Sequence, residues 1–422
     1  MTGAGLQALS TSALSGRIGD PNLRIVDTRP LAAYRGWRLR DEARGGHIAG
    51  AVDFPIGWLD RLEPGQIDAL LHAKDITPKQ SVVVYGYRDD AAERLAAVLR
   101  ARGGADISVY ADGLAAWAAD ASLPMEHLPR YQQLIYPEWL RELATGGAPP
   151  TYAGNGFLLF EVGYHGEDDY TAGHIPGAIY LDTLALETSN TKNRRAPAEL
   201  KQALLAHGIT SDRTVVLYAR DSTAAARAAL ILLYAGVADV RLLDGGFEAW
   251  QAAAYELETQ ANLPTPAGAF GVEIPQHPEY IVDIDAARTI LAAADAELVS
   301  VRSWREFIGD TSGYDYIGPQ GRIDGAVWGH AGSDKDRVED YRNPDDTMRN
   351  AEEVAANWRA WGVTPDKRIA FYCGTGWRAS EAFINAYVMG WPNIAVYDGG
   401  WFEWSSDPAN PVEQGVPGRG SS

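Results

Sequence analysis

The sequence predicts an α/β protein built from three tandem domains, each a mostly parallel β-sheet flanked by helices. One strand–loop–helix pattern occurs three times along the 422 residues, at domain-sized intervals. Within each copy, short apolar strands alternate with helical stretches, which favours a parallel sheet covered on both faces. The length independently suggests three domains at roughly 150 residues each.

Each copy contains a short apolar strand that ends in a tyrosine. The three segments are Ser81–Tyr85, Thr214–Tyr218 and Arg368–Tyr372, and the residues that follow them are Gly86, Ala219 and Cys373. These following residues lie 133 and 154 positions apart. The copies are therefore domains, because solenoid repeats have periods of about 20–50 residues.

Further residues recur in register with these strands. A tryptophan stands 31 positions after each of the three residues above, at Trp117, Trp250 and Trp404. Because two of the copies have no thiol, core packing explains these tryptophans better than catalysis. A Gly-His-Ile element precedes the strand in two copies, and we expect His47 and His174 to bond backbone in a turn.

Proline-rich and polar stretches at 122–129 and 258–268 separate the copies. We therefore expect domains at 1–128, 129–262 and 263–422, of which only the last contains a cysteine. The tail from Ser405 is rich in proline and glycine, so we expect it to lie on the surface or to be disordered.

Composition narrows the function classes. Hydrophobic residues make up 46% of the chain and charged residues 22%, which is ordinary for a globular protein. The formal charge of −19 disfavours nucleic acid as a partner. We expect no membrane span, because no apolar run approaches about 18 residues. The first residues lack the basic and apolar regions of a signal peptide, and a single cysteine fits a reducing compartment, so we expect a cytoplasmic protein.

Cys373 is the candidate nucleophile. It follows an apolar strand and precedes a helix predicted over 379–390, with Gly390 as its C-terminal cap. Gly374 and Gly376 allow a tight turn whose N–H groups point inward at an anion. Those groups, the helix N-terminus and Arg378 would favour a thiolate that solvent can reach at the end of the sheet. A buried, inert cysteine is the alternative.

These motifs resemble the rhodanese superfamily of sulfurtransferases, and in particular its three-domain bacterial thiosulfate sulfurtransferases. The resemblance rests on the Gly-His-Ile-x-Gly-Ala element, the acidic residue before Gly-Gly, and the six-residue loop from Cys373 to Arg378. It implies that the first two domains are inactive and the third is catalytic. The Cys373 thiolate would attack the outer sulfur of thiosulfate, sulfite would leave, and a thiol, cyanide or protein acceptor would take the sulfur.

The resemblance also implies roles for the loop, and it implies no metal and no cofactor beyond the covalent persulfide. Gly374, Thr375, Gly376 and Trp377 would form the cradle around the sulfur, and Arg378 would pair with the anionic donor. Four residues of the third domain are candidates for the rest of the pocket: Arg302, Trp328, His330 and Trp401. Arg302 has a structural alternative, because Asp27 and Arg29 of the first copy suggest an ion pair that braces a loop.

Three alternatives remain open. The loop begins Gly-Thr-Gly, which is closer to family members that use 3-mercaptopyruvate than to many that use thiosulfate. The chain could also be a persulfide carrier or a scaffold for a sulfur-trafficking partner. A cysteine phosphatase is disfavoured, because four residues separate Cys373 from Arg378 where those phosphatases have five.

Overall fold

The computed structural model describes residues 6–40 and 42–418. The chain forms two compact units that divide between Gln132 and Gln133, so the first predicted domain is one unit and the other two share the second. No helix of the described residues is long and apolar enough to cross a membrane.

Three five-stranded sheets form the framework, and every strand pair within them is parallel. In spatial order, the first sheet holds β1 (Gln7–Leu9), β6 (Asp106–Tyr110), β5 (Ser81–Tyr85), β2 (Leu23–Asp27) and β4 (Val52–Asp53). The second holds β10 (Ile179–Asp182), β9 (Phe157–Gly163), β11 (Thr214–Ala219), β12 (Asp239–Leu243) and β8 (Leu134–Ile135). The third holds β13 (Ile281–Val282), β18 (Ile394–Tyr397), β17 (Arg368–Tyr372), β14 (Ala296–Ser300) and β16 (Val327–Trp328).

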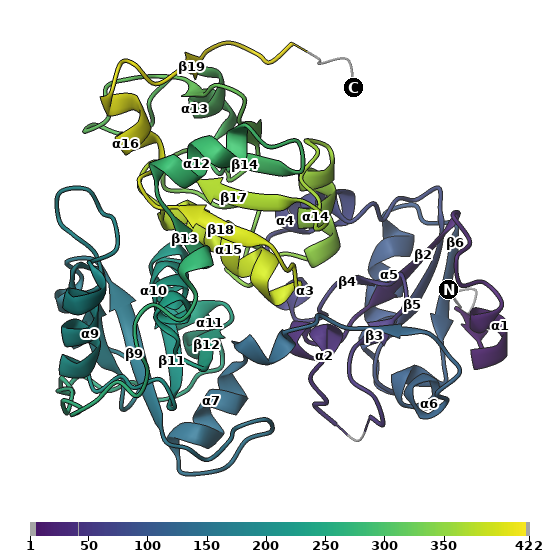
Figure 1. The fold of residues 1–422 in the computed structure, drawn as a ribbon. Helices are drawn as coiled ribbons and strands as arrows, with labels where there is room; N and C mark the ends of the chain where they lie inside the picture. The colour runs from purple at the N-terminus through teal and green to yellow at the C-terminus, as the bar shows by residue number, and fades with distance from the viewer. Residues whose placement is uncertain (1–5, 41, 419–422) are drawn as a thin grey trace. The chain divides into compact units, whose positions relative to one another are not determined.

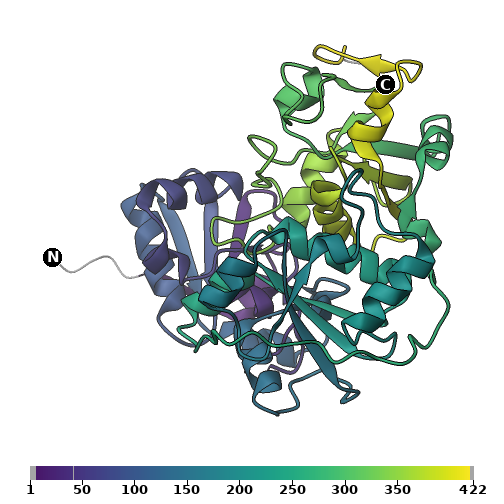
Figure 2. The same ribbon diagram turned by 90° about the vertical axis from the view of Figure 1, so that its left-hand side faces the viewer.

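Helices pack against these sheets, as Figures 1 and 2 show from two sides. Those of the first domain are α1 (Thr11–Ser15), α2 (Leu31–Arg35), α3 (Trp58–Arg61), α4 (Pro64–Ala73), α5 (Ala91–Ala101) and α6 (Gly113–Ala119). Those of the second are α7 (Pro137–Ala144), α8 (Glu167–Ala172), α9 (Pro197–Ala206), α10 (Ser222–Ala235) and α11 (Gly246–Ala252). Those of the third are α12 (Ile284–Leu291), α13 (Trp304–Ile308), α14 (Ala351–Arg359), α15 (Trp377–Val388) and α16 (Gly400–Ser406). The three-domain α/β prediction is confirmed.

The repeated tyrosine at the end of each central strand is explained by one hydrogen bond. The hydroxyls of Tyr85, Tyr218 and Tyr372 each accept the backbone N–H of the isoleucine in the Gly-x-Ile element, at 3.0–3.3 Å. All three tyrosines are fully buried. The bond ties the end of the strand to the turn in every domain, whether or not a cysteine follows.

An arginine adds a second tie to the same turn. Arg29 and Arg220 donate to the carbonyl oxygens of Gly46 and Gly173, at 2.7 and 2.6 Å, and Arg302 donates to that of Gly321. Arg29 also pairs with Asp27 at 2.6 Å, and both side chains are buried. The predicted ion pair that braces a loop is therefore present in the first domain.

The residue after the glycine of this turn faces a glutamate in every domain. His47 and His174 lie 3.6 and 3.5 Å from Glu126 and Glu258, and in the third domain Arg322 pairs with Glu413 at 2.9 Å. The same positions pair as antiparallel strands in β3 (His47–Ile48) with β7 (Met125–Glu126) and in β15 (Arg322–Ile323) with β19 (Val412–Glu413). Each histidine also bonds a backbone carbonyl through Nδ1 at 2.8 Å, as predicted.

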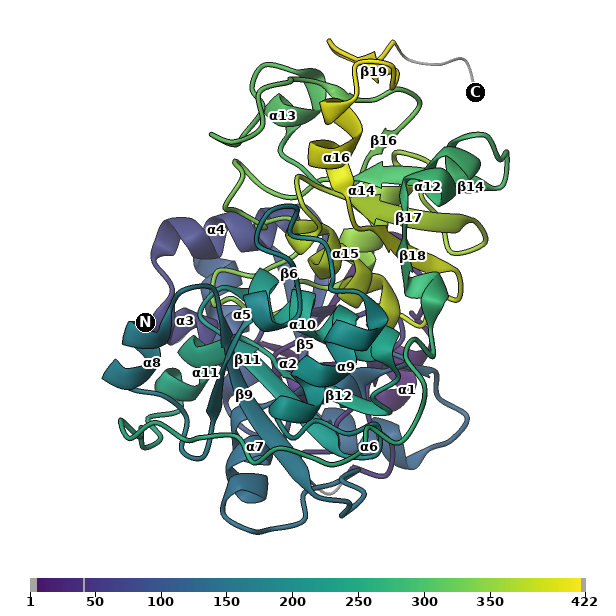
Figure 3. The same ribbon diagram turned by 60° about the vertical axis from the view of Figure 1, so that its left-hand side comes forward.

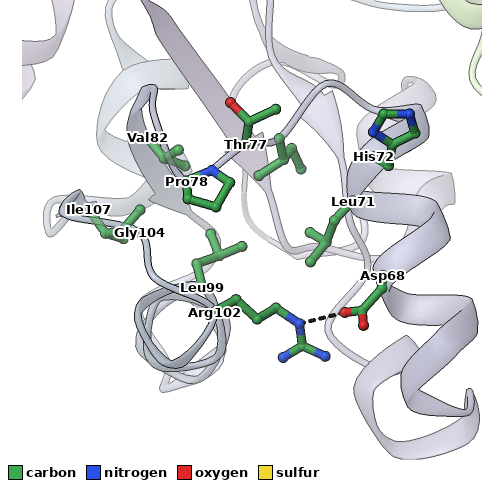
Figure 4. A pocket seen from close by; sticks show the side chains of 11 residues that line it. Asp68, Leu71, His72, Thr77, Pro78, Val82, Leu99, Arg102, Gly104 and Ile107 are labelled. Atoms are coloured by element: carbon green, nitrogen blue, oxygen red, sulfur yellow. Dashed lines mark hydrogen bonds and ion pairs between the residues drawn. The ribbon is translucent and has the colours of Figure 1, made fainter.

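Two cavities lie at the N-terminal ends of strands, one in the first domain and one in the third. The larger, about 350 Å³, lies between α4 and α5, where Asp68 and Arg102 pair at 2.7 Å (Figure 4). The other, about 300 Å³, lies beside the starts of β17 and β18. Trp117, Trp250 and Trp404 are at most 3% exposed, which confirms their place in the cores.

Replacing Asp27 with alanine should destabilise the first domain by about 3 kcal/mol, because the buried Arg29 would keep only the more distant carboxylate of Glu42, 3.7 Å away. Chemical denaturation measures this change. Asp60→Ala, which removes the exposed Arg94–Asp60 pair at 2.7 Å, is the matched control and should cost about 1 kcal/mol or less. Equal losses in the two variants would contradict the bracing role of Asp27.

Candidate active site

Cys373 lies where β17 ends and α15 begins, at the C-terminal edge of the third sheet. Strand β17 has the predicted bounds, whereas α15 begins at Trp377, two residues before the predicted start, and ends at Val388. Gly390 has a φ of +79°, as expected of a glycine just beyond a helix end. The segment between strand and helix is therefore only Cys373–Gly376. The last two residues of the six-residue loop, Trp377 and Arg378, lie in the first turn of the helix.

The sulfur of Cys373 accepts a hydrogen bond from the backbone N–H of Gly376, at 3.2 Å. Gly376 has a φ of +98°, a conformation that favours glycine. A Cβ atom there would also lie 3.1 Å from Arg227 Nη1 and 3.3 Å from Asp398 Oδ1. Both backbone conformation and crowding therefore require glycine at the position that donates to the sulfur.

The remaining N–H groups of the loop are available to a ligand. Among the described residues, no protein acceptor is seen for the amides of Gly374, Thr375, Trp377 or Arg378. The last two belong to the first turn of α15, where the helix itself provides no acceptor. These amides can stabilise an anion at the helix N-terminus, where the helix dipole also favours negative charge.

The repeated Asp-Gly-Gly turn supports the loop from the side of the sheet. The N–H groups of Trp401 and Phe402 donate to the carbonyls of Cys373 and Gly374, at 2.8 and 3.0 Å. A Cβ atom on Gly400 would lie 2.7 Å from both carbonyl oxygens, so glycine is needed for this approach. The Trp401 side chain is fully buried and donates to Pro319, which gives it a supporting place beneath the loop.

Arg378 already has a partner. Its guanidinium forms a two-point pair with Glu306, at 2.9 and 2.8 Å, and donates to the Tyr314 hydroxyl at 2.5 Å. Burial alone would raise the pKa of Glu306, but Arg378 and Arg302 hold it below its usual value. Glu306 is also the N3 residue of a Ser303–Glu306 capping box, a Ser-x-x-Glu pattern that the sequence displays.

The thiol is enclosed, whereas the sequence led us to expect one that solvent can reach. Cys373 is 1% exposed. The ring of Tyr314 covers Gly374 so closely that a Cβ there would lie 2.4 Å from it. Tyr316, itself 54% exposed, lies next to Tyr314 with ring centroids 5.4 Å apart. A substrate molecule therefore reaches the Cys373 sulfur only when side chains over the loop move.

Three other predicted pocket residues lie away from the loop or serve its support. Arg302 braces the turn at Gly321, which is the structural alternative raised above. Trp328 donates to the Arg302 carbonyl at 2.8 Å and stacks on His330 with ring centroids 3.7 Å apart. Within the described part of the chain, no hydrogen bond or ring contact joins Trp328 or His330 to the cysteine loop.

The second domain contributes to this site, and sequence reasoning did not identify its residues. The indole N–H of Trp377 donates to Glu187 at 3.0 Å, and Glu187 is fully buried. Tyr164 packs edge-on against Trp377 with ring centroids 5.9 Å apart. Nothing in the spacing of Glu187 or Tyr164 marks them in the sequence, because their contacts span about 200 residues of chain.

Comparison with known proteins identifies the family. The model of the rhodanese-like domain matches three segments, residues 10–120, 154–253 and 283–407. The thiosulfate sulfurtransferase YnjE of Escherichia coli is 44% identical over 95% of this chain and 91% of its own length. The sulfur carrier protein TtuD of Thermus thermophilus is 33% identical over 58% of this chain and 87% of its own.

Solved structures match over nearly the whole chain. A structure of EanB in complex with ergothioneine has a TM-score of 0.95 at 42% identity, covering 98% of this chain and all of that one. The anaerobic ergothioneine biosynthesis enzyme of Chlorobium limicola, in complex with trimethyl histidine, has a TM-score of 0.94 at 43% identity, with the same coverage. With three matched domains and these relatives, the chain belongs to the rhodanese-like family and is a sulfurtransferase.

Proposed function

We propose that this protein moves sulfane sulfur from thiosulfate, through a persulfide on Cys373, to a small acceptor. The observation that carries the proposal is the Gly376 N–H directed at the Cys373 sulfur, 3.2 Å away, at the start of α15. That donor and the helix dipole favour a thiolate, which is the reactive form of cysteine.

The reaction balances without a cofactor. The thiolate attacks the outer sulfur of thiosulfate, the sulfur–sulfur bond breaks, and sulfite leaves with the bonding electrons. Cys373 then carries the transferred sulfur as a persulfide. Cyanide or a thiol attacks that outer sulfur and regenerates the thiolate. The unbonded amides of Gly374, Thr375, Trp377 and Arg378 supply donors for the negative charge at each stage.

Thiosulfate as donor is supported by the name of the relative YnjE. Arg378 was expected to bind this anion. Its ion pair with Glu306 weakens that expectation, because the pair has no net charge. The loop amides and the Tyr314 hydroxyl are then the nearest donors for the sulfite group. With 3-mercaptopyruvate the leaving group would be pyruvate instead, and the same persulfide would form.

Treatment with thiosulfate should add the mass of one sulfur atom to the protein, and a reductant should remove it. Cys373→Ala should fold normally but acquire no sulfur, because Ala219 occupies the same place in the second domain. Intact mass spectrometry measures both outcomes, and 3-mercaptopyruvate provides the donor comparison. Retained thiosulfate:cyanide activity in Cys373→Ala would exclude the proposal, and efficient turnover of an aryl phosphate would favour a phosphatase.

Glu306→Gln should lower the KM for thiosulfate several-fold, because it frees the positive charge of Arg378 for the anionic donor. The same change should destabilise the third domain by roughly 3–5 kcal/mol, since Arg378 is then buried without a carboxylate. Steady-state kinetics and denaturation measure the two effects. An unchanged KM in a folded variant would show that Arg378 does not bind the donor.

A second candidate acceptor is a trimethylated histidine, which the structure of the Chlorobium limicola enzyme names as its natural substrate. EanB has a cysteine that carries a persulfide, a tyrosine 59 positions before it and a threonine two positions after it. Tyr314 and Thr375 stand at the same distances from Cys373. In this reaction a ring C–H of the imidazole becomes C–SH, and the persulfide returns to the thiol.

Aromatic side chains around the loop suit a quaternary ammonium group. Tyr316 packs against Phe402 with ring centroids 5.9 Å apart, and Tyr164 packs against Trp377 at the same separation. Tyr316 is 54% exposed, so its ring is open to a ligand, whereas the ammonium group of Lys192 lies 4.4 Å from the ring centroid of Tyr164. Aromatic faces attract quaternary ammonium cations.

Persulfidated protein mixed with trimethyl histidine should release ergothioneine, which mass spectrometry detects. Tyr316→Ala should raise the KM for trimethyl histidine about ten-fold and leave the rate with cyanide nearly unchanged, because cyanide has no cation to bind. If the persulfide reacts with cyanide but not with trimethyl histidine, the acceptor belongs to another class.

A further inference from the structure

The second and third domains meet through equivalent helices. Helix α10 follows Ala219 and helix α15 follows Cys373, and the two helices lie side by side in Figures 1 and 3. Arg227 stands eight positions after Ala219, and Glu381 stands eight positions after Cys373. Equivalent positions in the two helices therefore carry opposite charges.

Each of these charges is paired by a hairpin of its own domain. Glu187 and Arg194 are bridged in one hairpin, and Arg342 and Met348 in the other. Arg227 pairs with Glu187 at 3.0 Å, and Glu381 pairs with Arg342 at 2.7 Å. The two pairs are counterparts in related domains, with their signs exchanged.

Each hairpin also reaches the Asp-Gly-Gly turn of the other domain. The N–H of Arg194 donates to Asp398 at 2.7 Å, and the N–H of Met348 donates to Asp244 at 2.8 Å. These aspartates stand 25 positions after Cys373 and Ala219 respectively. The arrangement is thus reciprocal, which makes one side a natural control for the other.

Within the described residues, contacts to the cysteine loop come from the side that holds Arg227. Arg227 pairs with Asp398 at 2.7 Å as well as with Glu187, and these three buried residues form the cross-domain charge cluster. Glu187 accepts the indole N–H of Trp377, and Arg227 Nη1 would lie only 3.1 Å from a Cβ atom on Gly376. The cluster thus contacts Trp377 and Gly376. The N–H of Gly376 is the group that donates a hydrogen bond to the Cys373 sulfur.

The chemistry of the cluster indicates more than a structural ion pair. Arg227 Nη1 is buried and has no hydrogen-bond partner among the described residues. Burial opposes the charge of Arg227, but Asp398 and Glu187 raise its pKa above the ordinary value, so it stays protonated. Burial also raises the pKa of Glu187. Gly376 therefore lies beside both Arg227 and Asp398, in a cluster of one positive and two negative side chains.

We propose that Arg227 and Glu187 of the thiol-free second domain are positioning residues for Cys373, holding Gly376 against the sulfur and setting the local charge. The inference rests on the proposed function only in taking Cys373 as the nucleophile. The second domain is then part of the active site rather than a spacer. Removing either charge changes the reactivity of the sulfur, in opposite directions.

The direction follows from the charges that remain. Without Arg227, the carboxylates of Glu187 and Asp398 lose their counterion beside the loop and disfavour a thiolate. With glutamine at 187, the side-chain oxygen can still accept the Trp377 N–H. The cluster then has one negative charge fewer, which favours a thiolate at Cys373. Arg378, Tyr314 and Tyr316 also interact electrostatically with Cys373, and they are unchanged in both variants.

The experiment follows alkylation of the full-length protein by iodoacetamide across pH, using intact mass. Because the chain has one cysteine, every added group reports on Cys373. Arg227→Met should move the profile to higher pH and lower the rate near neutral pH about ten-fold. Glu187→Gln should move it to lower pH. Thermal unfolding confirms that each variant is folded, and Glu187→Gln carries the test if Arg227→Met does not fold.

Arg342→Met is the matched control, because it breaks the counterpart pair beside Asp244 of the thiol-free domain. It should lower stability but leave the alkylation profile in place. The inference is overturned if the folded Glu187→Gln protein matches the wild type or shifts to higher pH, or if Arg342→Met shifts as far as Arg227→Met. Opposite shifts in a protein that forms no persulfide would support the inference while excluding the proposed function.

Discussion

The hydrogen bond from the Gly376 N–H to the Cys373 sulfur is the interaction on which the site depends. It requires a left-handed backbone at Gly376, a helix that begins at Trp377, and carbonyls of Cys373 and Gly374 turned toward Trp401 and Phe402. Each condition uses a glycine or a main-chain group, so the cradle is made of backbone. Its geometry therefore depends on packing around the loop more than on the side chains within it.

The thiol-free domains show which parts of the fold are independent of chemistry. All three retain the buried tyrosine, the arginine bonded to the turn, and the basic residue facing a glutamate. The residue that follows the strand differs in each domain, as Gly86, Ala219 and Cys373 show. The Tyr and Arg ties hold the end of the strand in place, and the third domain adds a cysteine to that framework, which we propose as the nucleophile.

Much of this could be predicted from the sequence, because the repeated residues have local roles. The three tyrosines, the three tryptophans and the loop from Cys373 to Arg378 follow strands and turns whose patterns are short-range. The place of Glu306 in the first turn of a helix could also have been predicted, since Ser303-x-x-Glu306 is a capping-box pattern. The partners Glu187, Arg227 and Asp398 were not, because they meet only when two domains pack. The closure of Tyr314 over Gly374 is likewise a tertiary contact without a local signal.

The enclosure of Cys373 also has a chemical consequence. A persulfide open to solvent would pass its sulfur to any free thiol, whereas a buried one reacts only with acceptors that enter the site. Tyr314 contacts both Gly374 and Arg378, so its movement would open the sulfur and alter the Arg378–Glu306 pair together. In the proposed reaction, Tyr314 would therefore link access to the sulfur with the charge of the neighbouring Arg378.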